Sequence, residues 1–236
     1  MSAPGPAPGP GPRVVYDEDH AARLRAEAAA ALPPFLTGRQ ARELLAGEGV
    51  PERSTRHLLD NGWAGTPIRT SSALLFETRA VLALALRPRL GPRDLDAFAI
   101  PLLLVTRRAF PAGPDAATER ERLRGPWPLG RFASATLRAV LRLYGPQPLI
   151  ATVAGIVVQG AEITGARPGR PEPVPGGVGD AAVEPLTLDL APAGPWFPAC
   201  AATRVTHGPG RPWVLHGFDQ VSQAPRHPPS VGESSA

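Results

Sequence analysis

A short segment, residues 51–60, brings several hydrogen-bond donors together in the sequence. If this segment is a helix, Leu58 and Leu59, or one of them with Val50, form its buried side. Four polar residues then share the open side: Arg53, Ser54, Arg56 and His57. Guanidinium, hydroxyl and imidazole groups on one helix face can donate hydrogen bonds to phosphate oxygens and to the edges of bases.

A second group of reactive side chains, Cys200, His207 and His216, lies near the C-terminal end. Structural zinc needs four nitrogen or sulfur ligands, whereas this group supplies three and has no CxxC pair. A Cys–His pair for nucleophilic catalysis also needs a third residue to orient the base, and Asp189 or Asp219 could supply it. A lone cysteine is more often a small buried hydrophobic residue. We therefore expect no metal, no cofactor and no catalytic residue.

The basic residues exclude further chemistry, because all 25 Lys+Arg residues are arginine. Without lysine, the chain has no phosphate-loop lysine, no Schiff-base lysine and no kinase strand lysine. Several large classes of enzyme are excluded at once.

The segment before residue 51 reads as another helix. Ala41, Leu44 and Leu45 recur at the spacing of one buried helical face, and Thr37 can cap the start of that helix. Gly47 and Gly49 bracket a break before the second helix. Two helices joined by a sharp, glycine-containing turn form a helix-turn-helix, whose second helix can enter the major groove of DNA.

The segment after residue 60 predicts a hairpin followed by a third helix. Asn61 and Gly62 both tolerate the left-handed conformation that ends a helix. Residues 63–75 are polar, contain Gly65 and Pro67, and suit a small β-wing. Residues 76–86 resume helical spacing until Pro88 stops it.

Charge favours contact with phosphate in this region. Residues 37–93 hold nine arginines against five acidic residues, an excess of four that equals the net charge of +4 of the whole chain. The remainder of the chain therefore sums to zero, and we expect the positive surface on the helical unit.

Three consecutive segments resemble the winged helix-turn-helix of MerR and excisionase-like DNA-binding proteins. They are LTGRQARELLA, GVPERSTRHLLDNGW and, after a short polar wing, LFETRAVLAL. The resemblance covers residues 36–88. Pro88 and Pro92 exclude the long coiled coil that follows this domain in MerR proteins, so the excisionase-like branch is more similar. The resemblance implies contacts to DNA from Arg39, Arg53, Ser54, Thr55, Arg56, His57, Arg69 and Thr70.

The remaining chain predicts an α+β fold in four parts. Residues 1–15 and 221–236 are Pro-rich tails expected to be disordered. Residues 16–92 hold the winged helix-turn-helix preceded by a helix over 17–32, which would pack on it through Leu24, Ala28 and Leu32. Residues 93–220 form a mixed domain with a small antiparallel sheet.

Within the mixed domain, several elements are predicted individually. Residues 102–106 suit a buried strand, and residues 149–165 suit β-structure with a bend near Gly155 or Gly160. Residues 201–205 and 213–216 flank a Gly-rich tip and suggest a hairpin. Residues 131–144 read as an amphipathic helix with five residues spaced for burial: Phe132, Leu137, Val140, Leu141 and Leu143.

These observations lead to a first hypothesis: a cytoplasmic protein that binds double-stranded DNA, as a bacterial transcriptional regulator or a plasmid- or phage-type accessory factor. Its C-terminal domain would serve dimerisation or the sensing of an effector. The hypothesis requires Arg56 to face solvent and not the rest of the chain. The alternative is a protein–protein interaction module that uses the winged-helix unit without DNA, and the third is an enzyme that uses Cys200 and a histidine.

Overall fold

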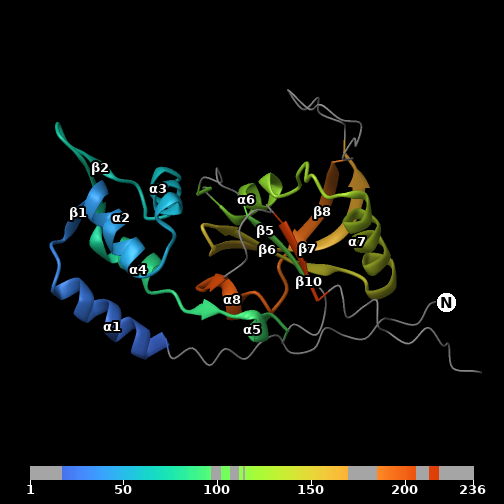
Figure 1. The fold of residues 1–236 in the computed structure, drawn as a ribbon, viewed down its shortest axis with the longest axis horizontal. Coiled ribbons are helices and arrows are strands. Elements are labelled where there is room, and N and C mark those ends of the chain that lie inside the picture. Colours follow the sequence, from blue (N-terminus) through green and yellow to red (C-terminus); the bar gives the residue numbers. More distant parts are fainter. Residues whose placement is uncertain are drawn as a thin grey trace, which may run out of the picture.

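The computed structural model describes residues 18–96, 102–106, 112–113, 115–169, 185–205 and 213–217. The two predicted tails and His207 lie outside these residues. The fold is α+β, as predicted, with a mainly helical N-terminal part and a second part built on a larger sheet (Figure 1).

The N-terminal part places three helices and a hairpin after one initial helix. Its elements are α1 (Glu18–Ala30), β1 (Phe35–Thr37), α2 (Gly38–Gly47), α3 (Glu52–Asp60), β2 (Ile68–Arg69), β3 (Leu74–Glu77) and α4 (Thr78–Ala85). The three strands form an antiparallel sheet in the order β1-β3-β2. The helices α2 and α3, the hairpin and the third helix were all predicted from local signals.

Helix α1 packs on α4 more loosely than the sequence predicts. Leu24, expected at the contact, is 48% exposed, and Ala28 and Leu32 are only half-buried. Leu24 is the one large apolar side chain of this alanine-rich helix, and about half of it remains exposed. The predicted packing of α1 on the helical unit is confirmed, whereas the predicted burial of Leu24 in that contact is wrong.

The second part is a seven-stranded mixed sheet rather than the small antiparallel sheet expected. Its elements are β4 (Arg89–Leu90), α5 (Pro92–Asp96), β5 (Leu102–Thr106), α6 (Ala116–Arg122), α7 (Arg131–Tyr144), β6 (Gln147–Val153), β7 (Ile156–Pro168), β8 (Leu186–Pro192), α8 (Pro198–Ala201), β9 (Arg204–Val205) and β10 (Trp213–His216). The strand order is β10-β5-β6-β7-β9-β4, with β8 also paired to β7. The pairs β5–β6 and β4–β9 are parallel.

The chain enters this sheet earlier than predicted. Strand β4 pairs with β9, so residues 89–90, which precede the boundary predicted at residue 92, belong to the larger sheet. The short segment between Ala85 and Arg89 therefore joins the two parts.

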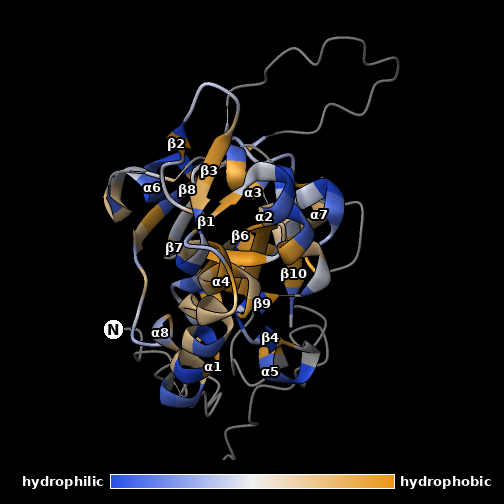
Figure 2. Cartoon of the chain, turned by 90° about the vertical axis from the view of Figure 1, so that its left-hand side faces the viewer, coloured by the Kyte–Doolittle hydropathy of each residue, from blue (hydrophilic) through white to orange (hydrophobic). Residues whose placement is uncertain are grey.

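Both faces of the sheet are covered, and alternate residues of the central strands point to different cores. Leu103 and Val105 of β5 belong to a core shared with Leu137 of α7, whereas Leu102 and Leu104 pack with the residues around α8. Because side chains of a strand alternate between its faces, a run of consecutive leucines can serve both cores. The strand β6 is buried at every residue for the same reason, and much of it is coloured hydrophobic (Figure 2).

A tight turn joins β6 to β7 at the bend predicted near Gly155. Ala154 and Gly155 have φ values of 56° and 80°, the left-handed pair that a two-residue hairpin turn requires. A Cβ atom on Gly155 would lie 2.9 Å from the carbonyl oxygen of Val205. The absence of a side chain at Gly155 therefore lets the turn lie directly against β9.

Two predictions for this part are wrong. Strands β9 and β10 do not form a hairpin, because β9 pairs with β4 and β7 while β10 pairs with β5 at the other edge of the sheet. Helix α7 has the predicted bounds, but Phe132 is 82% exposed and Leu143 is 68% exposed. The predicted burial of these two residues is therefore wrong.

In the described part of the chain, no helix has the length and apolar character needed to cross a bilayer.

Candidate nucleic-acid interface

The start of α2 is fixed by a reciprocal cap. The Thr37 hydroxyl accepts from the Gln40 backbone N–H, and the Gln40 side chain accepts from the Thr37 backbone N–H at 2.9 Å. Each contact satisfies a backbone donor that would otherwise lack a partner at the helix N-terminus. The cap confirms the predicted role of Thr37 and sets where α2 begins.

The turn between α2 and α3 sets the position of the second helix. Gly49 takes a φ of +78°, and the Val50 N–H then donates to the Leu45 carbonyl at 3.0 Å. Val50, Leu58 and Leu59 are all buried and join the same core as Leu45. These apolar contacts fix which side of α3 faces outward.

The outward side of α3 is polar and accessible. Arg53, Arg56, His57 and Asp60 are exposed, and the Arg56 side chain is 76% exposed. Arg56 Nε lies 3.2 Å from Asp60 Oδ2, one helical turn further on. The condition that Arg56 faces solvent is therefore met, although α3 also contacts strand β6 of the second part.

Thr55 does not belong to this outward face. It is fully buried, and its hydroxyl donates to the Glu52 carbonyl at 2.8 Å. A side chain with no accessible surface has no access to a ligand, so its predicted contact with DNA is wrong. Ser54 is half-buried and lies at the edge of the face.

Asp60 was not among the residues predicted at the site. Its position four residues after Arg56 is the spacing at which opposite charges meet on a helix, so the sequence did contain the signal. The pair places one carboxylate within the positive face. That carboxylate changes both the charge of the face and the orientation of Arg56.

Arg39 on α2 is exposed but already has a partner. Its Nε donates to Glu43 Oε1 at 2.8 Å, and this hydrogen bond raises the pKa of the Arg39 guanidinium. Both side chains are more than half exposed, so the pair contributes little to stability and remains open to exchange with another anion.

The β2–β3 hairpin carries the last two predicted residues. Arg69 is exposed at the end of β2. The Thr70 hydroxyl donates to the Ala73 carbonyl and accepts from the Ala73 N–H, both at 3.0 Å. Thr70 therefore shapes the hairpin turn that presents Arg69.

Family models, curated proteins and solved structures yield no match to this chain. The geometry of the site itself therefore carries the functional argument.

Not all arginines of residues 37–93 contribute to a surface for phosphate. Arg87 donates to the Val157 carbonyl at 2.6 Å, and Arg89 donates to the Glu48 carbonyl at 3.1 Å. Arg204 donates to the carbonyls of Glu48 and Arg87, and its burial, followed by the neighbouring charge of Arg89, lowers its pKa. These arginines hold the two parts of the chain together. The expectation that the whole excess charge meets phosphate is therefore too simple.

The charge that remains near α3 is smaller than the sequence count implies. Residues 38–70 contain five arginines and four acidic residues, and two of the arginines form the pairs Arg39–Glu43 and Arg56–Asp60. No ion-pair partner is found within the described residues for Arg42, Arg53 or Arg69. Glu48 and Glu52 lie in the same range, so five arginines against four acidic residues leave a net charge of +1.

Cys200 is buried, as expected for a structural cysteine, and its thiol donates to the Phe197 carbonyl at 3.2 Å. Burial raises the pKa of the Cys200 thiol to about 12, so the thiolate needed for attack is scarce at neutral pH. Across the described residues, no three His, Cys, Asp or Glu side chains gather where they could hold a metal ion. The neighbouring Trp196 is also buried. Its ring packs edge-to-face against the ring of Phe197, with 5.7 Å between the ring centroids.

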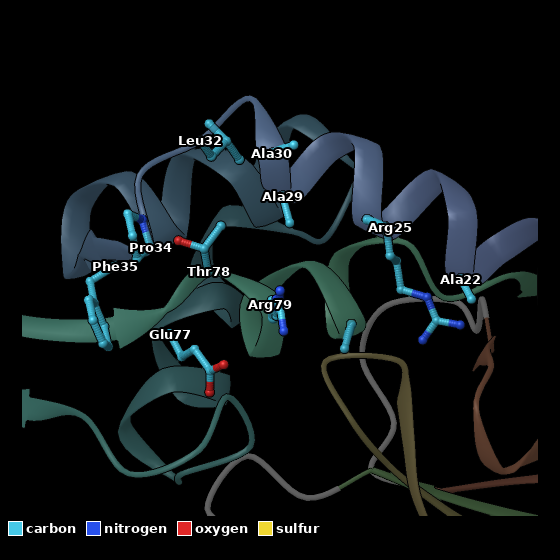
Figure 3. A pocket seen from close by; sticks show the side chains of 12 residues that line it. Ala22, Arg25, Ala29, Ala30, Leu32, Pro34, Phe35, Glu77, Thr78 and Arg79 are labelled. Atoms are coloured by element: carbon cyan, nitrogen blue, oxygen red, sulfur yellow. The ribbon is translucent and has the colours of Figure 1, made fainter.

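A groove of about 850 Å³ lies between α1 and α4 (Figure 3). Five alanines and Leu32 give it an apolar lining, and Arg25 reaches into it from α1. It exists because the alanines of α1 leave space above α4. Its lining comes from α1, β1, the end of β3 and α4, so it is separate from the outward face of α3.

Proposed function

We propose that the protein binds double-stranded DNA, with α3 in the major groove and the β2–β3 hairpin against the adjacent backbone. The observation that carries the proposal is the exposed side of α3, where Arg53, Arg56 and His57 face solvent while Leu58 and Leu59 anchor the opposite side. A helix held in this way offers its polar side to a groove wide enough to admit it.

The order of the surrounding elements supports the proposal. A helix, a short strand, two helices joined by a tight turn, and a two-stranded hairpin follow one another, with β3 in the centre of the small sheet. This order of elements supports our proposal of a winged helix-turn-helix, in which the hairpin would be the wing. Arg69 at the end of β2 is placed to contact phosphate beside the groove.

The charges near α3 set the expected strength of binding. With Arg42 and Arg69 as the main phosphate ligands, log K should fall with log[salt] with a slope of about −2. Such binding is measurable at low salt and weakens strongly in physiological salt. As a DNA-binding regulator or accessory factor, the protein would act in the cytoplasm, and its seven-stranded part would serve dimerisation or effector sensing.

Fluorescence anisotropy with labelled duplex DNA tests the proposal. The variant Arg53→Ala/Arg56→Ala should bind at least about tenfold more weakly than wild type. Arg131→Ala/Arg142→Ala on α7 is the matched control, because it removes two exposed arginines from a helix on the far side of the sheet part (Figure 1). Equal affinity of wild type and the α3 variant at low salt would rule out this use of α3.

A protein-interaction module is the second candidate, and the outer side of α7 favours it. Phe132 and Leu143 are both largely exposed there, and the helix carries three arginines and no acidic residue. Exposed large apolar residues beside charge are typical of surfaces that bind other proteins. This candidate predicts no salt-dependent binding to DNA, so the same anisotropy titration separates the two.

A further inference from the structure

The outward side of α3 carries side chains of restricted chemical types. All nine residues of the helix are described, and the exposed ones are Glu52, Arg53, Arg56, His57 and Asp60. None is an amide, and none presents a methyl group. Thr55, whose methyl group could have met thymine, is fully buried.

Each base pair selects particular side chains in the major groove. Arginine donates to both O6 and N7 of guanine, whereas asparagine or glutamine is the usual bidentate partner of adenine, and small apolar groups contact the thymine methyl. The outward side of α3 offers the guanine-reading type twice and the other types not at all. Arg53 and Asp60 are about 10 Å apart along the helix, which is the length of about three base-pair steps.

The ion pair within α3 leaves the reading atoms of Arg56 available. Asp60 Oδ2 accepts from Arg56 Nε, at 3.2 Å, and not from the two terminal nitrogens. While Asp60 accepts from Nε, Nη1 and Nη2 remain available as a planar fork of two donors for one base. Asp60 is then a positioning residue for Arg56.

Asp60 also disfavours binding that depends on the backbone alone. Its carboxylate repels phosphates, so non-specific contact by this face carries an electrostatic cost. The cost is offset where Arg56 finds a guanine. One residue can therefore orient the reading arginine and reduce binding to other sequences.

We propose that α3 reads G·C base pairs, with Arg53 and Arg56 on guanines and Asp60 holding the Arg56 fork. This inference rests on the proposed binding of duplex DNA. It adds the class of sequence that the site selects, and the residue that sets the selectivity.

The test compares affinity for two labelled duplexes of equal length, one with a G·C-rich centre and one with an A·T-rich centre. Wild type should prefer the G·C-rich duplex by about tenfold or more. Arg56→Lys keeps the charge but cannot form two parallel hydrogen bonds with guanine. Its affinity for the A·T-rich duplex should therefore stay within about twofold of wild type, while the preference for the G·C-rich duplex disappears. Asp60→Asn should bind the A·T-rich duplex more tightly and lose the preference, whereas Asp60→Glu should retain it.

The outcomes separate the inference from the proposed function. If wild type binds both duplexes equally, or prefers the A·T-rich one, base reading by α3 is wrong and binding of DNA stands. If wild type binds neither duplex at low salt, the proposed function fails and the inference fails with it. A preference that survives in both Arg56→Lys and Asp60→Asn would overturn the assigned roles of these two residues.

Discussion

Arg204 Nη1 lies 2.8 Å from the carbonyl oxygen of Glu48, a residue 156 positions earlier in the chain. Glu48 caps the C-terminal end of α2, and Arg204 begins β9. The carbonyls at a helix C-terminus carry partial negative charge, so a guanidinium is a favourable partner there. This contact joins the N-terminal helical part to the larger sheet and fixes the end of α2 that precedes α3.

Replacing Arg204 should loosen the junction between the two parts. Arg204→Ala removes the hydrogen bonds to Glu48 and Arg87, and we expect a loss of about 1–2 kcal/mol, reduced by the partial exposure of the side chain. Urea unfolding followed by circular dichroism measures the loss. Arg93→Ala on the exposed side of α5 is the control and should change stability by less than about 0.5 kcal/mol. Equal midpoints for the two variants would refute the role of Arg204.

The sequence predicted the elements whose signals are local. Thr37 at the start of α2, the glycines after it and Asn61-Gly62 after α3 each act on the nearest few residues, and the structure has these caps and turns where expected. The cap at Thr37 and the stop at Gly62 need no information from the rest of the chain. Helix α3 and its outward arginines were therefore accessible to sequence reasoning.

The partners of short strands were not accessible in the same way. Strand β10 pairs with β5, and β9 pairs with β4 and β7, all across long stretches of sequence. Strands of two to four residues carry too little pattern to select among distant partners. The same holds for Arg87 and Arg89, whose carbonyl partners lie on elements distant in the chain.

Thr55 separates a packing role from a binding role. Thr55→Val keeps the shape and removes the hydroxyl that donates to Glu52, so we expect stability to fall by about 1 kcal/mol. Affinity for duplex DNA should remain within about twofold of wild type, because the residue has no accessible surface. Thermal unfolding and anisotropy on one preparation give both values. Loss of affinity without loss of stability would restore Thr55 to the binding face.

Cys200 makes stability depend on alkaline pH. Burial raises the pKa of the thiol from 9.0 to about 12, so in the pH range between these values the unfolded chain releases a proton that the folded chain keeps. Stability is fully present below pH 9 and falls as the pH rises through this window, by up to about 1.4 kcal/mol per pH unit. Urea unfolding below and above pH 9 measures the fall, which Cys200→Ala should reduce. An identical fall in this variant would assign the dependence to other groups.

The two sides of α7 should respond differently to truncation. Leu137 is fully buried against the sheet, so Leu137→Ala should cost about 2–5 kcal/mol. Phe132 lies about 140° around the helix from Leu137 and is 82% exposed, so Phe132→Ala should change stability by less than about 0.5 kcal/mol. The predicted apolar set was too wide for one helix face, and small Ala133 and Ser134 occupy the buried side instead. Chemical denaturation of both variants measures the two changes in the free energy of unfolding. A large decrease for Phe132→Ala would contradict the exposure of this side chain.

Arg69 offers the most selective test of the β2–β3 hairpin. It is exposed, has no ion-pair partner among the described residues, and is the last residue of β2, directly before the turn that Thr70 holds. If it contacts one phosphate, Arg69→Ala should weaken binding to G·C-rich and A·T-rich duplexes by the same factor and reduce the salt slope by about 0.9. The measurement is anisotropy over a series of salt concentrations, with Arg142→Ala as the control of equal charge. An unchanged slope would place the hairpin away from the DNA, and a change on one duplex alone would make Arg69 a reader of bases.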